Sequence, residues 1–348
     1  MVRKGLQIAI CSLFMMYAGI VIAGRSEVGY HLLKKYDLGA APGGKEYWDY
    51  ITFDQASRRI YVSHNTEVKV VDADSGSVVG SIGDLKRVHG IALVPDRGRG
   101  FLSDGGADEA VMFDMKTLKV IGRIKTGGNP DCIIYDPASK HVITFNGKTN
   151  DASVIDPASA TVVATIPMGG RPEYAVADGQ GTIYDNIEDK NEVVALDSRS
   201  NTVKGRWPIA PAEGATAIDL DVQHHRLFIG GRNKVLAIMN ADSGKIVQTF
   251  PIGAGVDTNI FDPESGMLFV AVREGILHIF HEENADKFNT VEDVKTEFGA
   301  RNMAFDPKTH RLFLSSADFA PAAASTPNQP NLQPTPIPGT FRLLVYGR

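Results

Sequence analysis

Cysteine is scarce in this sequence, which holds only Cys11 and Cys132. The chain therefore has no C-x-x-C-H haem-attachment motif and too few thiols to build a cluster of soft-metal ligands. The G-x-S-x-G motif of one class of serine hydrolases and the phosphate-binding P-loop are absent as well. These absences exclude covalently attached haem and argue against two common enzyme classes.

The N-terminal segment has the features of a secretory signal peptide. Arg3 and Lys4 precede an apolar run from Leu6 to Ile22, and small residues stand just before Gly24. We predict a signal peptide over residues 1–23, a mature chain over residues 24–348, and a periplasmic or secreted protein without a membrane span after cleavage. The alternative is an uncleaved anchor, because the apolar run approaches membrane-spanning length.

Basic residues are also fewer than acidic residues. The whole chain has 36 Lys and Arg against 41 Asp and Glu, and loss of Arg3 and Lys4 with the signal leaves 34 cations and a net charge of −7. Binding to nucleic acid depends on clustered cations that neutralise phosphates. We therefore expect no nucleic acid partner. Cys132 is the lone thiol of the mature chain, so an internal disulfide is excluded.

One pattern repeats along the chain with a period near 41 residues, and helical periodicity is absent. An Asp that opens a turn recurs at steps of 42, 40, 42, 43, 41 and 44 residues, at Asp54, Asp96, Asp136, Asp178, Asp221, Asp262 and Asp306. A repeat of this length that holds four short strands is typical of a β-propeller blade. We predict an all-β, seven-bladed β-propeller of four-stranded antiparallel blades.

The two ends of the chain predict how the ring closes. The last copy ends after its third strand, Phe341 to Tyr346, whereas Tyr30 to Gly39 resembles the outer strands of other copies, such as Ala160 to Gly169. We therefore expect the N-terminal strand to complete the last blade. A Pro- and Ala-rich insertion at 317–339 lengthens the last copy, and we expect an extended loop without ladder strands there.

The repeats resemble those of a known family. The segment from Thr161 to Asp185 and the sequence DPKTHRLFLSS resemble the YVTN repeats of the YncE-like seven-bladed propellers, and the resemblance covers residues 30–348. It implies an extracytoplasmic protein. Many members have no assigned reaction, and related propellers include lactonases, surface proteins and electron-transfer enzymes. The resemblance therefore implies a fold and does not choose a function.

Two sets of variable positions fall on one predicted face. The ring set precedes each inner strand: Asp49, His89, Asp131, Glu173, Thr216, Asp257 and Arg301. The second set follows each second strand: His64, Asp104, Asn146, Asn186, Arg232, Arg273 and Ser316. We predict a polar funnel with these ligand-binding residues: Asp49, His64, His89, Asp104, Asp131, Asn146, Glu173, Asp257 and Arg301. The alternative is that channel mouths are polar in any propeller.

One residue of the ring set and two aromatic residues beside it leave further alternatives open. Arg301 could clamp a carboxylate or phosphate, or it could pair with Asp257 or Asp49 and neutralise the ring. Tyr47 and Trp48 could stack on a ligand, although packing is the commoner role of aromatic side chains.

The sequence thus favours a binding or scaffold protein that recognises a small polar ligand or a protein partner. We expect a monomer without a cofactor, and we assign no catalytic or metal-binding residue. The alternative is a lactonase-like hydrolase in which a metal, His64 or His89 activates water.

Overall fold

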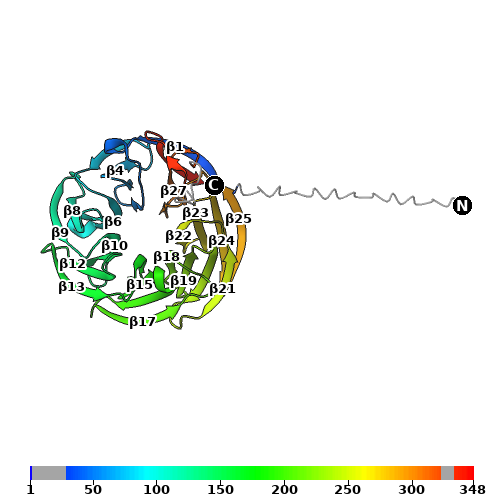
Figure 1. Cartoon of the computed structure of the whole chain (residues 1–348). Coiled ribbons are helices and arrows are strands. Elements are labelled where there is room, and N and C mark those ends of the chain that lie inside the picture. Colours follow the sequence, from blue (N-terminus) through cyan, green and yellow to red (C-terminus); the bar gives the residue numbers. More distant parts are fainter. Residues whose placement is uncertain (2–28, 323–332) are drawn as a thin grey trace.

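The structure, a computed structural model, describes Met1, residues 29–322 and residues 333–348. Its strands form seven four-stranded antiparallel sheets arranged around a central axis (Figure 1). This arrangement confirms the predicted all-β, seven-bladed β-propeller. The predicted signal peptide lies outside the described residues, apart from Met1.

Each of the first six blades consists of four consecutive strands. Blades 1 and 2 contain β2 (Ile51–Asp54), β3 (Arg59–His64), β4 (Glu67–Asp72), β5 (Val78–Ile82), β6 (Val88–Val94), β7 (Arg99–Asp104), β8 (Glu109–Asp114) and β9 (Val120–Lys125). Blades 3 and 4 contain β10 (Pro130–Asp136), β11 (His141–Asn146), β12 (Asp151–Asp156), β13 (Thr161–Pro167), β14 (Pro172–Ala177), β15 (Thr182–Ile187), β16 (Glu192–Asp197) and β17 (Thr202–Pro208).

The remaining blades continue the pattern until the ring closes. Blades 5 and 6 contain β18 (Ala215–Asp221), β19 (Arg226–Gly231), β20 (Val235–Asn240), β21 (Ile246–Pro251), β22 (Val256–Asp262), β23 (Met267–Val272), β24 (Ile276–Asn284) and β25 (Lys287–Lys295). Blade 7 combines β26 (Met303–Asp306), β27 (Arg311–Ser316), β30 (Phe341–Gly347) and β1 (His31–Gly39). Three short 3-10 turns lie between the strands: η1 (Pro42–Gly44), η2 (Pro95–Arg97) and η3 (Glu188–Lys190).

Strand composition follows position in the blade. The second strand of blade 6, β23, reads MLFVAV and is buried along nearly its whole length, because both of its faces pack against neighbouring blades. The outer strand of blade 3, β13, alternates between exposed and covered residues, because its outer side meets solvent. The recurring Asp stabilises the first turn through its side chain. Asp54, for example, accepts hydrogen bonds from the Ala56 amide and the Ser57 hydroxyl.

The N-terminal strand closes the ring as predicted. β1 pairs antiparallel with β30, and the sheet order is β1, β30, β27, β26. Tyr30 lies edge-on against Phe269 of blade 6 at 5.1 Å between ring centroids, and Leu38 packs in the core between blades 7 and 1. Tyr30 just before β1 and Leu38 near its end therefore add buried apolar contacts to the ladder of this strand.

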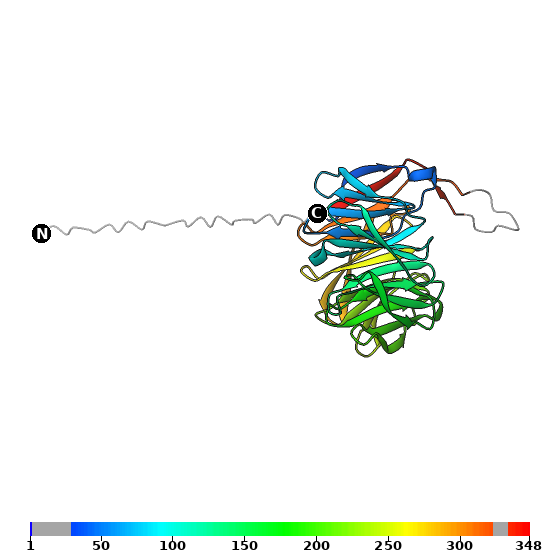
Figure 2. The same ribbon diagram turned by 90° about the vertical axis from the view of Figure 1, so that its left-hand side faces the viewer.

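The insertion departs from its prediction in one respect. β28 (Phe319–Ala320) and β29 (Thr335–Pro336) form a two-stranded ladder, so the expectation of no ladder strands is wrong at these residues. Pro336 lacks an amide hydrogen, but an edge position needs only its carbonyl group. The side view in Figure 2 shows the base of the insertion and η1 on the same side of the ring. No helix among the described residues has the length and apolarity that crossing a membrane requires.

Candidate functional site

The segments that precede the inner strands meet in a cavity of about 180 Å³. All seven residues of the ring set line it, together with five others: Asp49, His89, Asp131, Glu173, Thr216, Asp257 and Arg301, with Tyr47, Tyr50, Arg87, Tyr174 and Arg232. The repeat register therefore placed the ring set correctly in space. Whether these residues bind a ligand stays a prediction.

A break in strand register accompanies five of the ring positions. In blades 2 to 6 the pairing of the inner strand with the second strand shifts at its first residues, for example between Val88 and Ile91 and between Pro130 and Ile133. His89 and Asp131 lie inside these two breaks. Such irregularities redirect side chains out of the regular alternation, and here they accompany side chains that line the cavity.

Two buried serines hold the backbone beneath the ring set. The hydroxyl of Ser63 accepts a hydrogen bond from the Asp49 amide at 2.8 Å. Ser103, at the equivalent position of the next blade, accepts from the Gly90 amide at 2.7 Å and donates to the Asp131 carbonyl. A Cβ on Gly90 would stand 2.8 Å from Ile133, so glycine allows blades 2 and 3 to approach closely.

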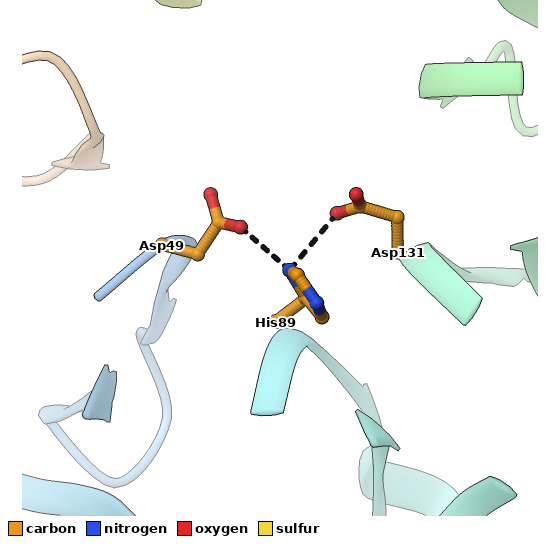
Figure 3. Close-up of side chains that lie close together, drawn as sticks. All are labelled: Asp49, His89 and Asp131. Carbon is orange, nitrogen blue, oxygen red and sulfur yellow. Dashed lines mark hydrogen bonds and ion pairs between the residues drawn. The ribbon is translucent and has the colours of Figure 1, made fainter. Parts of the chain in front are cut away.

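His89 lies between two carboxylates, as Figure 3 shows. Its Nδ1 is 2.8 Å from Asp49 Oδ2 and 3.3 Å from Asp131 Oδ1. The Tyr47 hydroxyl donates to Asp49 at 2.7 Å, and the Arg87 guanidinium stands 4.5 Å above the Tyr47 ring. Five residues from blades 1 to 3 and the segments before them thus form one polar cluster.

Burial and crowding of like charges set the electrostatics of this cluster. Burial raises the pKa of Asp131 to about 7; His89 opposes this rise, and Asp49 and Asp257 add to it. Burial would also raise the pKa of Asp49, but the hydrogen bond and charge of His89 hold it below its usual value. The imidazole shows the reciprocal effect, because the two aspartates outweigh burial and raise the pKa of His89.

The other side of the cavity carries a second group of charges. Burial and the nearby Asp131 raise the pKa of Glu173 well above its usual value. Asp257 accepts a hydrogen bond from Asn302 at 2.8 Å and lies 3.3 Å from the Nε of Arg301. Of the two pairings considered for Arg301, the structure shows the one with Asp257. Arg232 pairs with Glu188 at 2.6 Å.

Two tyrosines form the floor of the cavity. Tyr50 and Tyr174 come from blades 1 and 4, and both line the cavity and a larger hollow of about 1280 Å³ that reaches the first turns on the opposite face. Sequence reasoning did not select them. The available signal was their position, because each directly follows a ring-set residue.

A pocket of 260 Å³ adjoins the mouth and shares Tyr47 and Arg301 with the cavity. Phe319 and Pro336 of the insertion line this pocket, so the base of the insertion stands beside the mouth. Trp48 contributes to the pocket wall, but it is buried and packs 5.1 Å from Phe341. Packing is therefore its main role.

Three predicted ligand-binding residues do not line the cavity. His64 is buried, contacts Glu46 at 2.5 Å and stacks on Phe341. Asp104 accepts hydrogen bonds from the amides of Lys86 and Arg87. Asn146 donates to Asp151 and Ser153. These side chains hold blades and loops together, because the ends of the second strands point into the protein and not into the channel.

The rest of the second set divides in the same way. Arg232 lines the cavity and Arg273 lines the adjoining pocket. Asn186 donates to the Ala217 carbonyl, and Ser316 donates to the Phe298 carbonyl. The second set is therefore mainly structural, whereas the ring set forms the cavity.

Comparison with known proteins supports the fold. No model of a protein family and no curated protein sequence matches the chain. A chain from a crystal structure of the mitotic checkpoint complex is similar at a TM-score of 0.72 with 15% identity, and 99% of each chain is covered. A chain from hydrazine synthase of Kuenenia stuttgartiensis is similar at 0.67 with 16% identity, covering 76% of this chain and 91% of that one. At these identities the similarity shows a shared β-propeller fold, and the YVTN-repeat family stays a prediction.

Proposed function

We propose that the protein is an extracytoplasmic binding propeller that holds a small polar ligand in the central cavity. One observation carries this proposal: acidic and basic side chains from all parts of the ring converge on a hollow with an aromatic floor. Ordinary blade geometry does not require them, because the turns and cores of the blades are already complete without these residues.

The charges indicate what kind of ligand fits. Asp131, Glu173 and Asp257 all have pKa values raised by burial, so the cavity favours a group that donates hydrogen bonds or carries positive charge. Arg87 and Arg301 also line the cavity and could hold an anionic group of the same ligand. A small compound with amine or hydroxyl groups suits this arrangement best.

A thermal-shift screen tests the proposal with amines, amino acids, hydroxy acids and sugars. We expect one of these classes to raise the melting midpoint of the unaltered protein and not that of Glu173→Gln. Asp219→Asn is the matched control, because Asp219 is a half-buried carboxylate in the hollow beyond the tyrosine floor. The proposal fails if no class shifts the midpoint, or if Glu173→Gln responds like the unaltered protein.

The extracytoplasmic location is part of the same proposal and rests on the signal-like N-terminus. Expression of the full chain followed by cell fractionation and mass spectrometry of its N-terminus tests it. A mature chain beginning near Gly24 outside the cytoplasm supports the location, and an uncleaved cytoplasmic chain contradicts it.

A lactone-hydrolysis assay separates the binding proposal from the hydrolase alternative. Turnover by the unaltered protein that is lost in His89→Gln would replace the binding proposal with a catalytic one. Without such turnover, a ligand found by the screen is bound and released unchanged.

A further inference from the structure

We propose that Asp49, His89 and Asp131 hold a divalent transition-metal ion in the wall of the central cavity. The inference rests on the proposed function, since the ion would be the cationic part of what the cavity binds. It also adds a specific chemistry, because a metal ion can bind a polar ligand directly through its open coordination positions.

The distances between the three side chains suit such an ion. One imidazole nitrogen and two carboxylate oxygens lie within 4.8 Å of one another. Metal–nitrogen and metal–oxygen bonds of about 2.0 to 2.2 Å place neighbouring ligand atoms roughly 2.9 to 3.4 Å apart. The separations from Nδ1 of 2.8 Å and 3.3 Å are close to that range.

The histidine can present a lone pair on Nδ1 to the ion when its proton resides on Nε2. His89 is only 2% exposed and lines the cavity, and its Nε2 has no hydrogen-bond partner among the described residues. When the proton resides on Nε2, the hydrogen bond that Nδ1 donates to Asp49 at 2.8 Å is replaced by a bond from each of these two atoms to the ion. In that tautomer Nδ1 and two carboxylates converge as three electron-pair donors, and a cation between them relieves their mutual repulsion.

The surrounding residues balance the charge of the ion and hold its ligands in position, as metal sites require. Two aspartates would balance the charge of a divalent ion, and the Tyr47 hydroxyl orients Asp49 through its 2.7 Å hydrogen bond. Ser63 and Ser103 fix the backbone at Asp49 and Asp131. The cavity beyond the three ligands leaves room for water or a bound compound to complete the coordination sphere.

The ligand types indicate which ion. Imidazole favours zinc, iron, nickel and copper over calcium and magnesium, whereas the two carboxylates also suit manganese. We therefore expect Zn²⁺ and Mn²⁺ to bind more tightly than Ca²⁺.

A second histidine–carboxylate cluster provides an internal control. Asp221, His224 and Glu282 also come within 4.8 Å of one another, on the face opposite the cavity. His224 is 41% exposed and belongs to a first turn, where its Nδ1 contacts Asp221 at 2.7 Å. A variant at His224 removes a similar group of atoms without touching the cavity.

Isothermal titration of the chelator-treated full chain with ZnCl₂, MnCl₂ and CaCl₂ tests the inference. We expect one Zn²⁺ or Mn²⁺ per chain, more than about 100-fold weaker binding in His89→Ala and Asp131→Asn, and about 10-fold weaker binding in Tyr47→Phe. His224→Ala should bind like the unaltered chain. Circular dichroism verifies folding, and Asp131→Asn decides the outcome if His89→Ala does not fold.

The possible outcomes separate this inference from the proposed function. Absence of Zn²⁺ and Mn²⁺ binding at millimolar concentration, or loss of binding in His224→Ala alone, overturns the metal site. If an organic ligand from the screen still binds in a Glu173-dependent way, the proposed function stands without a metal. If metal binds as expected and no compound does, the metal site stands and the proposed organic ligand falls.

Discussion

Tyr50 and Tyr174 lie against each other across the centre of the ring, with ring centroids 5.0 Å apart, although they belong to blades 1 and 4. The Tyr50 hydroxyl also donates to the Glu173 carbonyl at 3.1 Å. This contact divides the central channel into the polar cavity on one side and the larger hollow on the other.

Removal of the Tyr50 hydroxyl should loosen the floor without deleting the ring contact. We expect Tyr50→Phe to lower the free energy of unfolding by about 0.5 to 1.5 kcal/mol, because one partly buried hydrogen bond is lost. Tyr174→Ala should cost about 2 to 4 kcal/mol and join the two hollows. Urea unfolding measures both, and a Tyr174→Ala protein as stable as the unaltered one would show that the floor contributes nothing.

Ser103 and Ser315 offer a matched pair of buried hydroxyls at the same strand position. The Ser103 hydroxyl bonds to Gly90 and Asp131, whereas the Ser315 hydroxyl has no partner among the described residues. We expect Ser103→Ala to cost about 1 to 3 kcal/mol in urea unfolding and Ser315→Ala to be neutral or stabilising. Equal effects of the two substitutions would contradict a special role for Ser103 in holding the ring set.

The closing strand should be essential for a stable ring. A chain that begins at Leu38 loses most of the ladder between β1 and β30 and the buried Tyr30 side chain. We expect it to aggregate or to lose its cooperative thermal transition, because the last blade then exposes an edge. A chain that begins at Gly29 is the control. Equal melting midpoints for the two truncated chains would disprove closure by β1.

Stability should depend on pH through Asp219. Burial raises its pKa to about 7, against which the Phe261 and Leu220 amides act. The folded state therefore holds the proton more tightly than the unfolded chain, whose Asp pKa is about 3.9. The contribution of the Asp219 carboxyl group to the free energy of unfolding is therefore fully present below pH 4, and it is lost as the pH rises towards 7.

The substitution Asp219→Asn should remove this pH dependence. We expect it to be roughly 1 to 3 kcal/mol more stable than the unaltered protein at pH 8 and similar at pH 4. Urea unfolding across this range measures the difference. Glu264→Gln, at an exposed carboxylate, is the control, and a difference that does not change with pH would contradict the assignment.

Asp185 should be replaceable by an apolar residue with a gain in stability. It is fully buried in β15, both of its carboxylate oxygens lack partners among the described residues, and burial raises its pKa well above the usual value. Val62 and Leu102 occupy the equivalent position in other blades. We expect Asp185→Val to raise the free energy of unfolding by about 1 to 3 kcal/mol at neutral pH.

Thermal unfolding of Asp185→Val and Asp185→Asn at pH 5 and pH 8 checks this prediction. In the unaltered protein the folded core keeps the Asp185 carboxyl group protonated, whereas the unfolded chain ionises it at pH 8. Ionisation favours the unfolded state, so the gain in stability from Asp185→Val should be larger at pH 8 than at pH 5. A loss of stability at both pH values would show that Asp185 has a partner or a task in the folded protein.

The sequence by itself determined the architecture and the positions of the ring set. The recurring Asp turns report local backbone geometry, which each blade repeats, so Asp54 and its counterparts revealed seven blades without any knowledge of tertiary contacts. The likeness of Tyr30 to Gly39 to other outer strands predicted closure for the same reason. Repeat register also placed Asp49, His89 and Asp131 at one channel mouth, because equivalent positions in a closed ring face a common axis.

Only the tertiary structure decided which polar residues reach the cavity and which partners they find there. His64, Asp104 and Asn146 end their strands with side chains turned into the protein, and a one-residue change of direction at a strand end is not visible in a repeat pattern. The contact between Tyr50 and Tyr174 depends on the width of the whole ring. Asp49 and Asp131 both contact His89 because three successive blades pack closely. The spacing between blades cannot be derived from the sequence of one repeat.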